Sequence, residues 1–230
     1  NVTPNVMFGS GNANGSFTGV NQNDVELGLR GKLRYDLGGN PQNIFNYDGD
    51  KTYTFSPSDG VAPGDRSLFN FEWSINVDPF DNIEDELNDL DDLIYMLSID
   101  YDPTDNVDFT SFDPINQPYA DHAIGNNTTG NGGGAVAVDP TEYQTFISVN
   151  NVAQNSWNLG FFEPAGFDPQ TQGKYTIELS AYWNGFLQAS TSIDIVYGEV
   201  PRAVPVPSSV LVLLAGLGGF MLVRRRQSQK

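Results

Sequence analysis

The sequence YTIELSAYW (175–183) is followed by Asn184-Gly185 and then by FLQASTSIDIVY (186–197). Both stretches are rich in β-branched and aromatic residues, and apolar and polar residues alternate along the first. Asn-Gly favours a two-residue hairpin turn, because both of its residues must adopt a positive φ. The sequence therefore predicts an antiparallel hairpin. The residues expected to face the core are Tyr175, Ile177, Leu179, Ala181 and Trp183.

Two earlier segments show the same period of two. In Leu68–Val77 (LFNFEWSINV), apolar and polar residues alternate, which is typical of a strand with one face on the core and one face in water. Asp24–Tyr35 (DVELGLRGKLRY) has a similar pattern, and Leu93–Tyr101 predicts a further strand after an acidic helical turn near Glu84–Asp92. The polar face of Leu68–Val77 is expected in water, and it holds Asn70, Glu72, Ser74 and Asn76.

One helix is expected among these strands. Asp139 is a suitable N-cap, Pro140 suits the first helical position, and Glu142 places an acid in the first turn, so a helix is predicted from there to about Val152. With 24 Gly, 14 Pro and turn-rich connections, the chain has room for eight to ten strands. The predicted fold class is mainly β: an antiparallel β-sandwich, jelly-roll-like, spanning residues 1–199.

Charge divides the chain into two parts. The 230 residues contain 29 acids and 11 bases, for a net charge of −18. All the acids lie in residues 1–199 with six of the bases, so that part carries −23 and the remaining 31 residues carry +5. An acidic domain lacks the cations that contact a phosphate backbone, which argues against a nucleic-acid partner. The absence of Cys excludes disulfides, thiol nucleophiles and cysteine-bound metals.

The C-terminal tail predicts a membrane anchor. A Pro-rich stalk (200–207) precedes an uncharged apolar stretch (208–223), and a basic tail (224–230) follows it. A helix over 208–223 is slightly short for a bilayer, and the flanking arginine stems and apolar residues extend its reach. The positive-inside rule places the Arg cluster in the cytoplasm and the acidic domain outside. The small residues expected to let another helix pack closely are Ala215, Gly216, Gly218 and Gly219.

The order of these tail elements resembles the PEP-CTERM sorting signal, and more closely its VPLPA-CTERM variant, because Val206 stands at the usual Glu position. The sorting motif is Val204, Pro205, Val206, Pro207 and Ser208, and the closing cluster is Arg224, Arg225 and Arg226. The resemblance covers residues 204–226. It implies an exported protein of a Gram-negative bacterium that is recognised by an exosortase. An exported chain that starts at Asn1 is expected to have lost a signal peptide.

Within the acidic domain, the thirteen acids between Asp78 and Asp113 have no base among them. Four of them are spaced closely enough to suggest oxygen ligands for Ca²⁺, although a solvated acidic surface is the stronger expectation. The candidate ligands are Asp100, Asp102, Asp105 and Asp108. Catalysis by the single His122, next to Asp121, is not expected, because no nucleophile motif accompanies it.

Several aromatic residues lie in loop-like segments, where they either anchor the loops to the sandwich or present a surface to sugars or proteins. Burial is the stronger expectation. These residues are Tyr101, Phe109, Phe112, Tyr119, Trp157, Phe161, Phe162 and Phe167.

The sequence favours a non-enzymatic, exported protein, anchored in the inner membrane with a periplasmic domain or sorted to the cell surface, with a structural or interaction role. Its expected partners are the bilayer and the exosortase. One alternative is a single-span accessory subunit of a larger membrane-protein complex. Another is a Ca²⁺-dependent module that binds extracellular polysaccharide.

Overall fold

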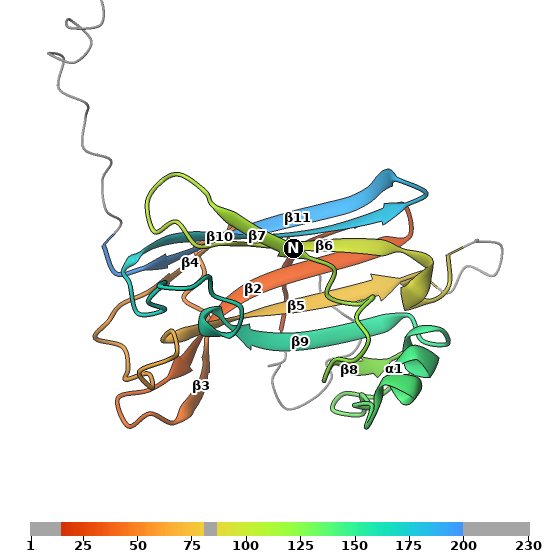
Figure 1. Ribbon diagram of the computed structural model, residues 1–230, viewed down its shortest axis with the longest axis horizontal. Coiled ribbons are helices and arrows are strands. Elements are labelled where there is room, and N and C mark those ends of the chain that lie inside the picture. The colour runs from red at the N-terminus through yellow and green to blue at the C-terminus, as the bar shows by residue number, and fades with distance from the viewer. Residues whose placement is uncertain (1–14, 81–86, 200–230) are drawn as a thin grey trace, which may run out of the picture.

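The computed structural model describes residues 15–80 and 87–199, which form a sandwich of two sheets (Figure 1). The strands of the larger sheet are β1 (Thr18–Gln22), β2 (Val25–Tyr35), β3 (Pro41–Ile44), β5 (Phe69–Val77), β8 (Ala123–Gly125) and β9 (Val152–Asn158). The strands of the smaller sheet are β4 (Thr52–Phe55), β6 (Ile94–Asp100), β7 (Phe109–Phe112), β10 (Gly173–Trp183) and β11 (Phe186–Tyr197). Short 3-10 turns lie at Leu90–Asp92 and Leu159–Phe161, and helix α1 is Pro140–Ile147.

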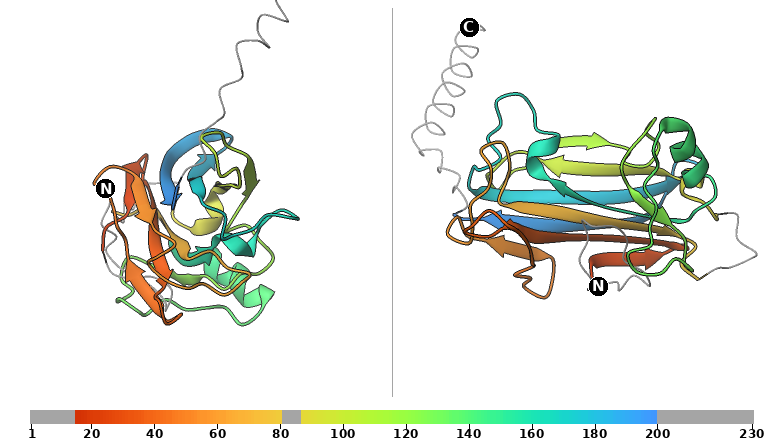
Figure 2. Two further views of the ribbon diagram at one scale, coloured as in Figure 1. Left: turned by 90° about the vertical axis from the view of Figure 1, so that its left-hand side faces the viewer. Right: turned by 90° about the horizontal axis from the view of Figure 1, so that it is seen from below.

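The larger sheet runs in the order β1-β2-β5-β9-β8, with β3 also paired to β2, and the smaller sheet runs β4-β11-β10-β6-β7. Figure 2 shows the two sheets face to face, with β2 against β11 across the core. They approach closely at Gly31 of β2, where an added Cβ would lie 2.9 Å from Tyr53 Cβ and 3.2 Å from an Ile195 carbon. All ladders are antiparallel except that of β4 with β11, so the purely antiparallel sandwich expected from the sequence is corrected to a mixed one.

The C-terminal hairpin is confirmed. Strands β10 and β11 pair along their length, and Asn184 and Gly185 have φ values of 49° and 80°, as the turn requires. Tyr175, Ile177 and Leu179 are fully buried in the core. A bulge between Ala181 and Tyr182 interrupts the alternation, which leaves the last expected core residue, Trp183, only half-buried.

Strand β5 confirms the expected inner face and corrects the outer one. Phe69, Phe71, Trp73, Ile75 and Val77 are fully buried between the sheets. The polar residues on the opposite face were expected in water, yet each is at most 5% exposed: Asn70, Glu72, Ser74 and Asn76. Segments distant in the sequence cover them. Asn127, for example, from the loop after β8, accepts a 2.8 Å hydrogen bond from the Asn76 side chain.

Helix α1 begins as expected and ends earlier. The Asp139 side chain accepts hydrogen bonds from the backbone of Thr141 and Glu142, which caps the helix. The helix stops at Ile147, not near Val152, because Val152 begins β9 in the centre of the molecule. Strands β3 and β7 lie within segments that were expected to be loops (38–49 and 103–118).

Among the described residues, no helix is long and apolar enough to cross a membrane. The stalk, the expected membrane helix with its small residues, the sorting motif and the Arg cluster (200–230) lie outside the described residues, as do the acids from Asp81 to Glu86.

Candidate functional site

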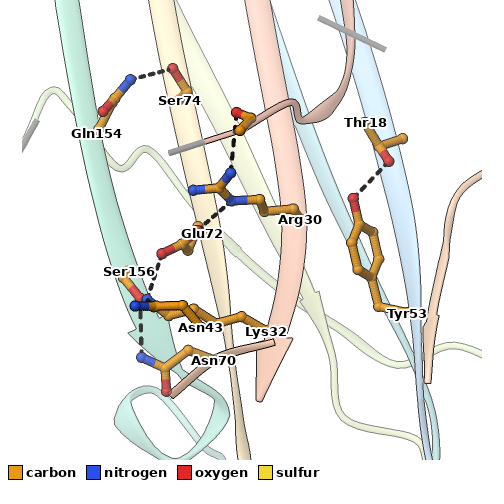
Figure 3. A network of polar contacts seen from close by, with 11 residues as sticks. Thr18, Arg30, Lys32, Asn43, Tyr53, Asn70, Glu72, Ser74, Gln154 and Ser156 are labelled. Carbon is orange, nitrogen blue, oxygen red and sulfur yellow. Dashed lines mark hydrogen bonds and ion pairs between the residues drawn. The ribbon is translucent and has the colours of Figure 1, made fainter. Parts of the chain in front are cut away.

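The outer face of the larger sheet carries a continuous layer of polar side chains from three neighbouring strands. Register places Arg30 of β2 opposite Glu72 of β5, and Glu72 opposite Ser156 of β9. Because side chains alternate along a strand, every second residue of each strand joins this face. Figure 3 shows the resulting contacts, which run across the sheet as far as the Gln154–Ser74 hydrogen bond of 3.0 Å.

Two cations share one buried carboxylate at the centre of this layer. The Glu72 side chain accepts a hydrogen bond from Arg30 Nε on one oxygen, and its other oxygen lies 2.5 Å from Lys32 Nζ. None of the three side chains is more than 3% exposed. The trio carries a net positive charge, because two cations face one anion. Burial lowers the pKa of Lys32, and the Glu72 carboxylate opposes that shift.

Aromatic rings cover the Arg30 end of the trio. The Arg30 guanidinium carbon lies 4.0 Å from the centre of the Phe17 ring and 4.7 Å from that of Phe45, distances at which a cation is attracted to the ring face. Arg30 Nη1 also donates to the Gly15 carbonyl at 3.2 Å. These contacts replace part of the hydration that the buried guanidinium loses.

The Lys32 end of the trio opens toward an amide cluster. Lys32 Nζ donates to Asn43 Oδ1 of β3 at 3.1 Å, and Asn70 donates to Ser156 Oγ at 3.1 Å. Asn158 Nδ2 donates to Asn70 Oδ1 at 2.9 Å and also contacts the carbonyls of Ser67 and Phe69. Its Oδ1 accepts from the amides of Ser67 and Gly160, so Asn158 ties the strand ends together.

A pocket of about 430 Å³ lies at this end of the sheet, where β2 and β9 finish and β5 begins. Its lining combines two cations, three amides, a hydroxyl, two aromatic rings and a proline. The lining residues are Lys32, Arg34, Tyr35, Pro41, Asn43, Asn70, Ser156, Asn158 and Phe161. In a chain with so few bases, two cations in one pocket make it a candidate site for a polar ligand with negative charge.

Arg34 is the cation of this pocket that has no carboxylate partner among residues 15–80 and 87–199. Its guanidinium carbon lies 5.4 Å from the centre of the Tyr35 ring, which supports it from one side. The side chain is half-buried, and its backbone amide donates to the Leu68 carbonyl. The guanidinium therefore has a ring on one side and retains its capacity to donate hydrogen bonds.

His122 is a core residue. It is fully buried, its Nε2 lies 2.6 Å from the Pro114 carbonyl, and its Nδ1 lies 3.0 Å from Asn155 Nδ2. Because the carbonyl can only accept and the amide nitrogen can only donate, the proton is on Nε2 and the ring is neutral. Burial lowers the pKa of His122 to about 4. Nε2 contacts the loop carbonyl of Pro114 and Nδ1 contacts the Asn155 side chain of β9, so both ring nitrogens are engaged in structural hydrogen bonds.

The candidate Ca²⁺ ligands are not brought together as a metal site. In the described parts of the chain, no three His, Cys, Asp or Glu side chains are grouped so that they could hold a metal ion. Asp100 is fully buried and uses its carboxylate to accept hydrogen bonds from the backbone amides of Asp102, Asp108 and Thr176. Asp102 accepts from the Thr104 amide in the same way. Asp105 and Asp108 are exposed.

The loop aromatics divide evenly between burial and exposure. Tyr101 and Trp157 are buried, and Phe112 and Phe167 pack against the core, as expected. The other four are exposed, which corrects the expectation for Phe109, Tyr119, Phe161 and Phe162. Phe161 is 48% exposed, and it lines the pocket described above.

Sequence reasoning did not single out the pocket, because its residues come from four strands and a turn that are up to 129 positions apart. One signal was present in the sequence. Arg30, Lys32 and Arg34 are half of the bases before residue 200, and their spacing of two places them on one face of a strand.

The chain matches no family model, no curated protein and no solved structure in the comparisons made with each.

Proposed function

We propose that this chain is a non-enzymatic, exported protein of the Gram-negative cell surface or periplasm, with a structural or interaction role. In this proposal the sandwich is the exported domain, and residues 208–223 form a transmembrane helix that ends at the Arg cluster. The tail carries the proposal: its motif, apolar stretch and basic cluster occur in the order of a PEP-CTERM-like signal of the VPLPA type. An exosortase-type enzyme would recognise it.

The described domain supports an interaction role in two ways. First, the single histidine is neutral and engaged in structural hydrogen bonds, so the usual acid–base side chain is committed to the core. Second, the outer face of the larger sheet ends in a rigid polar pocket, which suits recognition of a ligand. An acidic domain that is attached to a membrane and carries such a pocket fits binding better than chemistry.

The way the chain leaves the sandwich also supports attachment through the C-terminus. The end of strand β11 lies between the edge strand β4 and β10, and β11 ends at Tyr197, shortly before the tail. The Gly198 amide donates to the Phe55 carbonyl, and the Glu199 amide donates to Gln172 Oε1. The tail is therefore joined to a strand that is hydrogen-bonded on both sides.

The test is to fractionate producing cells and measure the intact mass of the protein in each fraction. We expect the protein in the membrane or surface fraction, with any mass loss confined to cleavage near Pro207. A triple variant (Arg224→Ala, Arg225→Ala and Arg226→Ala) should accumulate unprocessed or in the wrong fraction. Lys230→Ala, which removes a base outside the cluster, is the matched control. Full-length protein in the cytoplasm, with or without the Arg cluster, would overturn the proposal.

A further inference from the structure

We propose that the pocket between Arg34, Asn43 and Ser156 binds a uronate residue, a sugar ring that carries a carboxylate, within an acidic saccharide. This inference names the ligand class of the interaction site and rests on the proposed interaction role of the domain. Three features of the pocket carry it: a guanidinium with no carboxylate partner in the described parts of the chain, neutral polar groups for the ring hydroxyls, and aromatic surfaces for the ring itself.

Charge comes first. Two of the three outward-facing cations of β2, Lys32 and Arg34, line the pocket, and the Glu72 carboxylate is already shared between Lys32 and Arg30. The positive charge of Arg34 is therefore uncompensated by any described carboxylate. A planar guanidinium binds a carboxylate through two parallel hydrogen bonds, which fixes the orientation of the ligand as well as its charge.

The neutral groups of the pocket have hydrogen-bonding capacity to spare. Asn43 is exposed, and its Oδ1 accepts a hydrogen bond from the Lys32 ammonium. This bond leaves the two Nδ2 hydrogens of Asn43 as donors for a ligand. Ser156 Oγ accepts from Asn70 and keeps its own hydrogen for a further acceptor. Donors at fixed positions beside a cation match the ring oxygen and the oxygen on C4, which lie on either side of the carboxylate of a uronate ring.

The positions of these donors are fixed by buried neighbours. Asn70 and Asn158 line the pocket at 5% and 1% exposure, and they hold each other and the ends of β5 and β9 through four hydrogen bonds. Such a preformed lining lowers the ordering cost of binding. Figure 3 shows Lys32, Asn43, Asn70 and Ser156 gathered at this end of the sheet.

Two aromatic residues give the pocket its apolar surface. Tyr35 is half-buried against the core, and Phe161 is half-exposed, with the Arg66 guanidinium 4.9 Å from its ring centre. The C–H face of a pyranose is apolar and packs against such rings. An inorganic anion would use the cations and the neutral donors, whereas a uronate uses the rings as well. The combination favours the saccharide over phosphate and over an acidic peptide.

The test is calorimetric titration of the full-length protein in detergent with trigalacturonate. The matched ligands are trigalactose, which lacks the carboxylates, inorganic phosphate, and a triglutamate peptide. We expect trigalacturonate to bind and the other three to bind at least tenfold more weakly. Arg34→Ala should weaken trigalacturonate binding by tenfold or more, and Arg34→Lys should restore only part of it, since lysine loses the paired hydrogen bonds.

Asn43→Ala and Phe161→Ala should each weaken binding several-fold. Lys174→Ala removes a base from β10 in the other sheet and should leave binding unchanged, which controls for the loss of one positive charge. Melting curves of the Arg34 and Phe161 variants should match the parent, because both side chains are at least partly exposed. Asn43→Ala should melt at a lower temperature, because it removes a hydrogen bond from the buried Lys32 ammonium, so its binding is compared below its melting range. Equal binding of trigalactose, phosphate or the peptide would overturn the proposal. So would the absence of trigalacturonate binding, or binding that Arg34→Ala leaves intact.

This result is independent of the sorting experiment. A protein that is sorted as proposed but does not bind trigalacturonate would overturn the proposed uronate binding and leave the proposed localisation intact. A protein that binds trigalacturonate through Arg34 yet stays in the cytoplasm would do the reverse.

Discussion

Arg30 and Glu72 face each other across the β2–β5 ladder and form an ion pair in which neither side chain is more than 1% exposed. Lys32 joins the same carboxylate from the next outward position of β2. Buried charges are costly to remove from water, and a pair offsets that cost only while both signs are present. The layer of polar side chains on this sheet therefore depends on one residue, Glu72.

Replacing Glu72 with alanine should strongly destabilise the domain. The change leaves two buried cations without an anion, and we expect a loss of roughly 3–5 kcal/mol in the free energy of unfolding. Urea titration followed by tryptophan fluorescence measures it. Lys51→Ala breaks the 3.8 Å pair with Asp194 at the exposed edge and should cost at most about 1 kcal/mol. Similar losses in the two variants would contradict the account.

Stability should depend on His122 in mildly acidic solution. Its pKa is about 4 in the fold against an ordinary value of 6.5, so the unfolded chain binds the proton more readily between these pH values. Stability is therefore unaffected above pH 6.5 and falls as the pH drops toward 4, by on the order of 3 kcal/mol.

The measurement is the difference in unfolding free energy between the parent and His122→Gln at several pH values. This comparison cancels the contribution of the carboxylates, which are the same in both proteins. The advantage of the parent should shrink as the pH falls from 6.5 to 4. A constant difference would mean that the histidine does not titrate with a lowered pKa.

Gly31→Ala should push the two sheets apart at a place where they approach closely. The new methyl carbon would lie 2.9 Å from Tyr53 Cβ and 3.2 Å from an Ile195 carbon of the opposite layer, both closer than van der Waals contact. Overpacking of this kind costs about 1–3 kcal/mol. Gly64→Ala is the matched control, because nothing lies within 4 Å of its added Cβ. Thermal melts should therefore show a clear fall in melting temperature for Gly31→Ala, and a rise or a much smaller fall for Gly64→Ala.

Asp100→Ala should loosen the loop between β6 and β7. The buried carboxylate accepts hydrogen bonds from the amides of Asp102 and Asp108, so its loss leaves those donors unpaired and costs roughly 1–3 kcal/mol. Hydrogen exchange should show faster exchange of both amides. Asp105→Ala, at an exposed position of the same loop, should change neither stability nor exchange. Protection of the two amides in Asp100→Ala would contradict this role.

The sequence predicted the parts of the fold whose pattern is local. The Asn-Gly turn, the inward face of β5 and the Asp139 cap depend on residues within a few positions of one another, and all three are confirmed. The burial of Glu72 could not be inferred in this way. It depends on Arg30 and Lys32, which lie about 40 residues away, and on rings that cover the outer face.

The pocket and the acidic loop also depend on contacts that no local sequence pattern specifies. Arg34, Asn43 and Ser156 become neighbours only when β2, β3 and β9 join one sheet, a pairing that no local pattern specifies. Conversely, Asp100 is close in sequence to other acids, and this spacing suggests a metal site. The structure instead directs its carboxylate to backbone amides, because buried N–H groups need acceptors.

The position of the end of β11, between β4 and β10, has a mechanical consequence. A force applied through the C-terminus would act along β11, nearly parallel to its ladders with β4 and β10. The hydrogen bonds of both ladders would then bear the load together in shear, and they would not open one after another as they do when an edge strand is peeled away. A domain pulled through this strand should therefore resist unfolding more than one pulled through an edge strand.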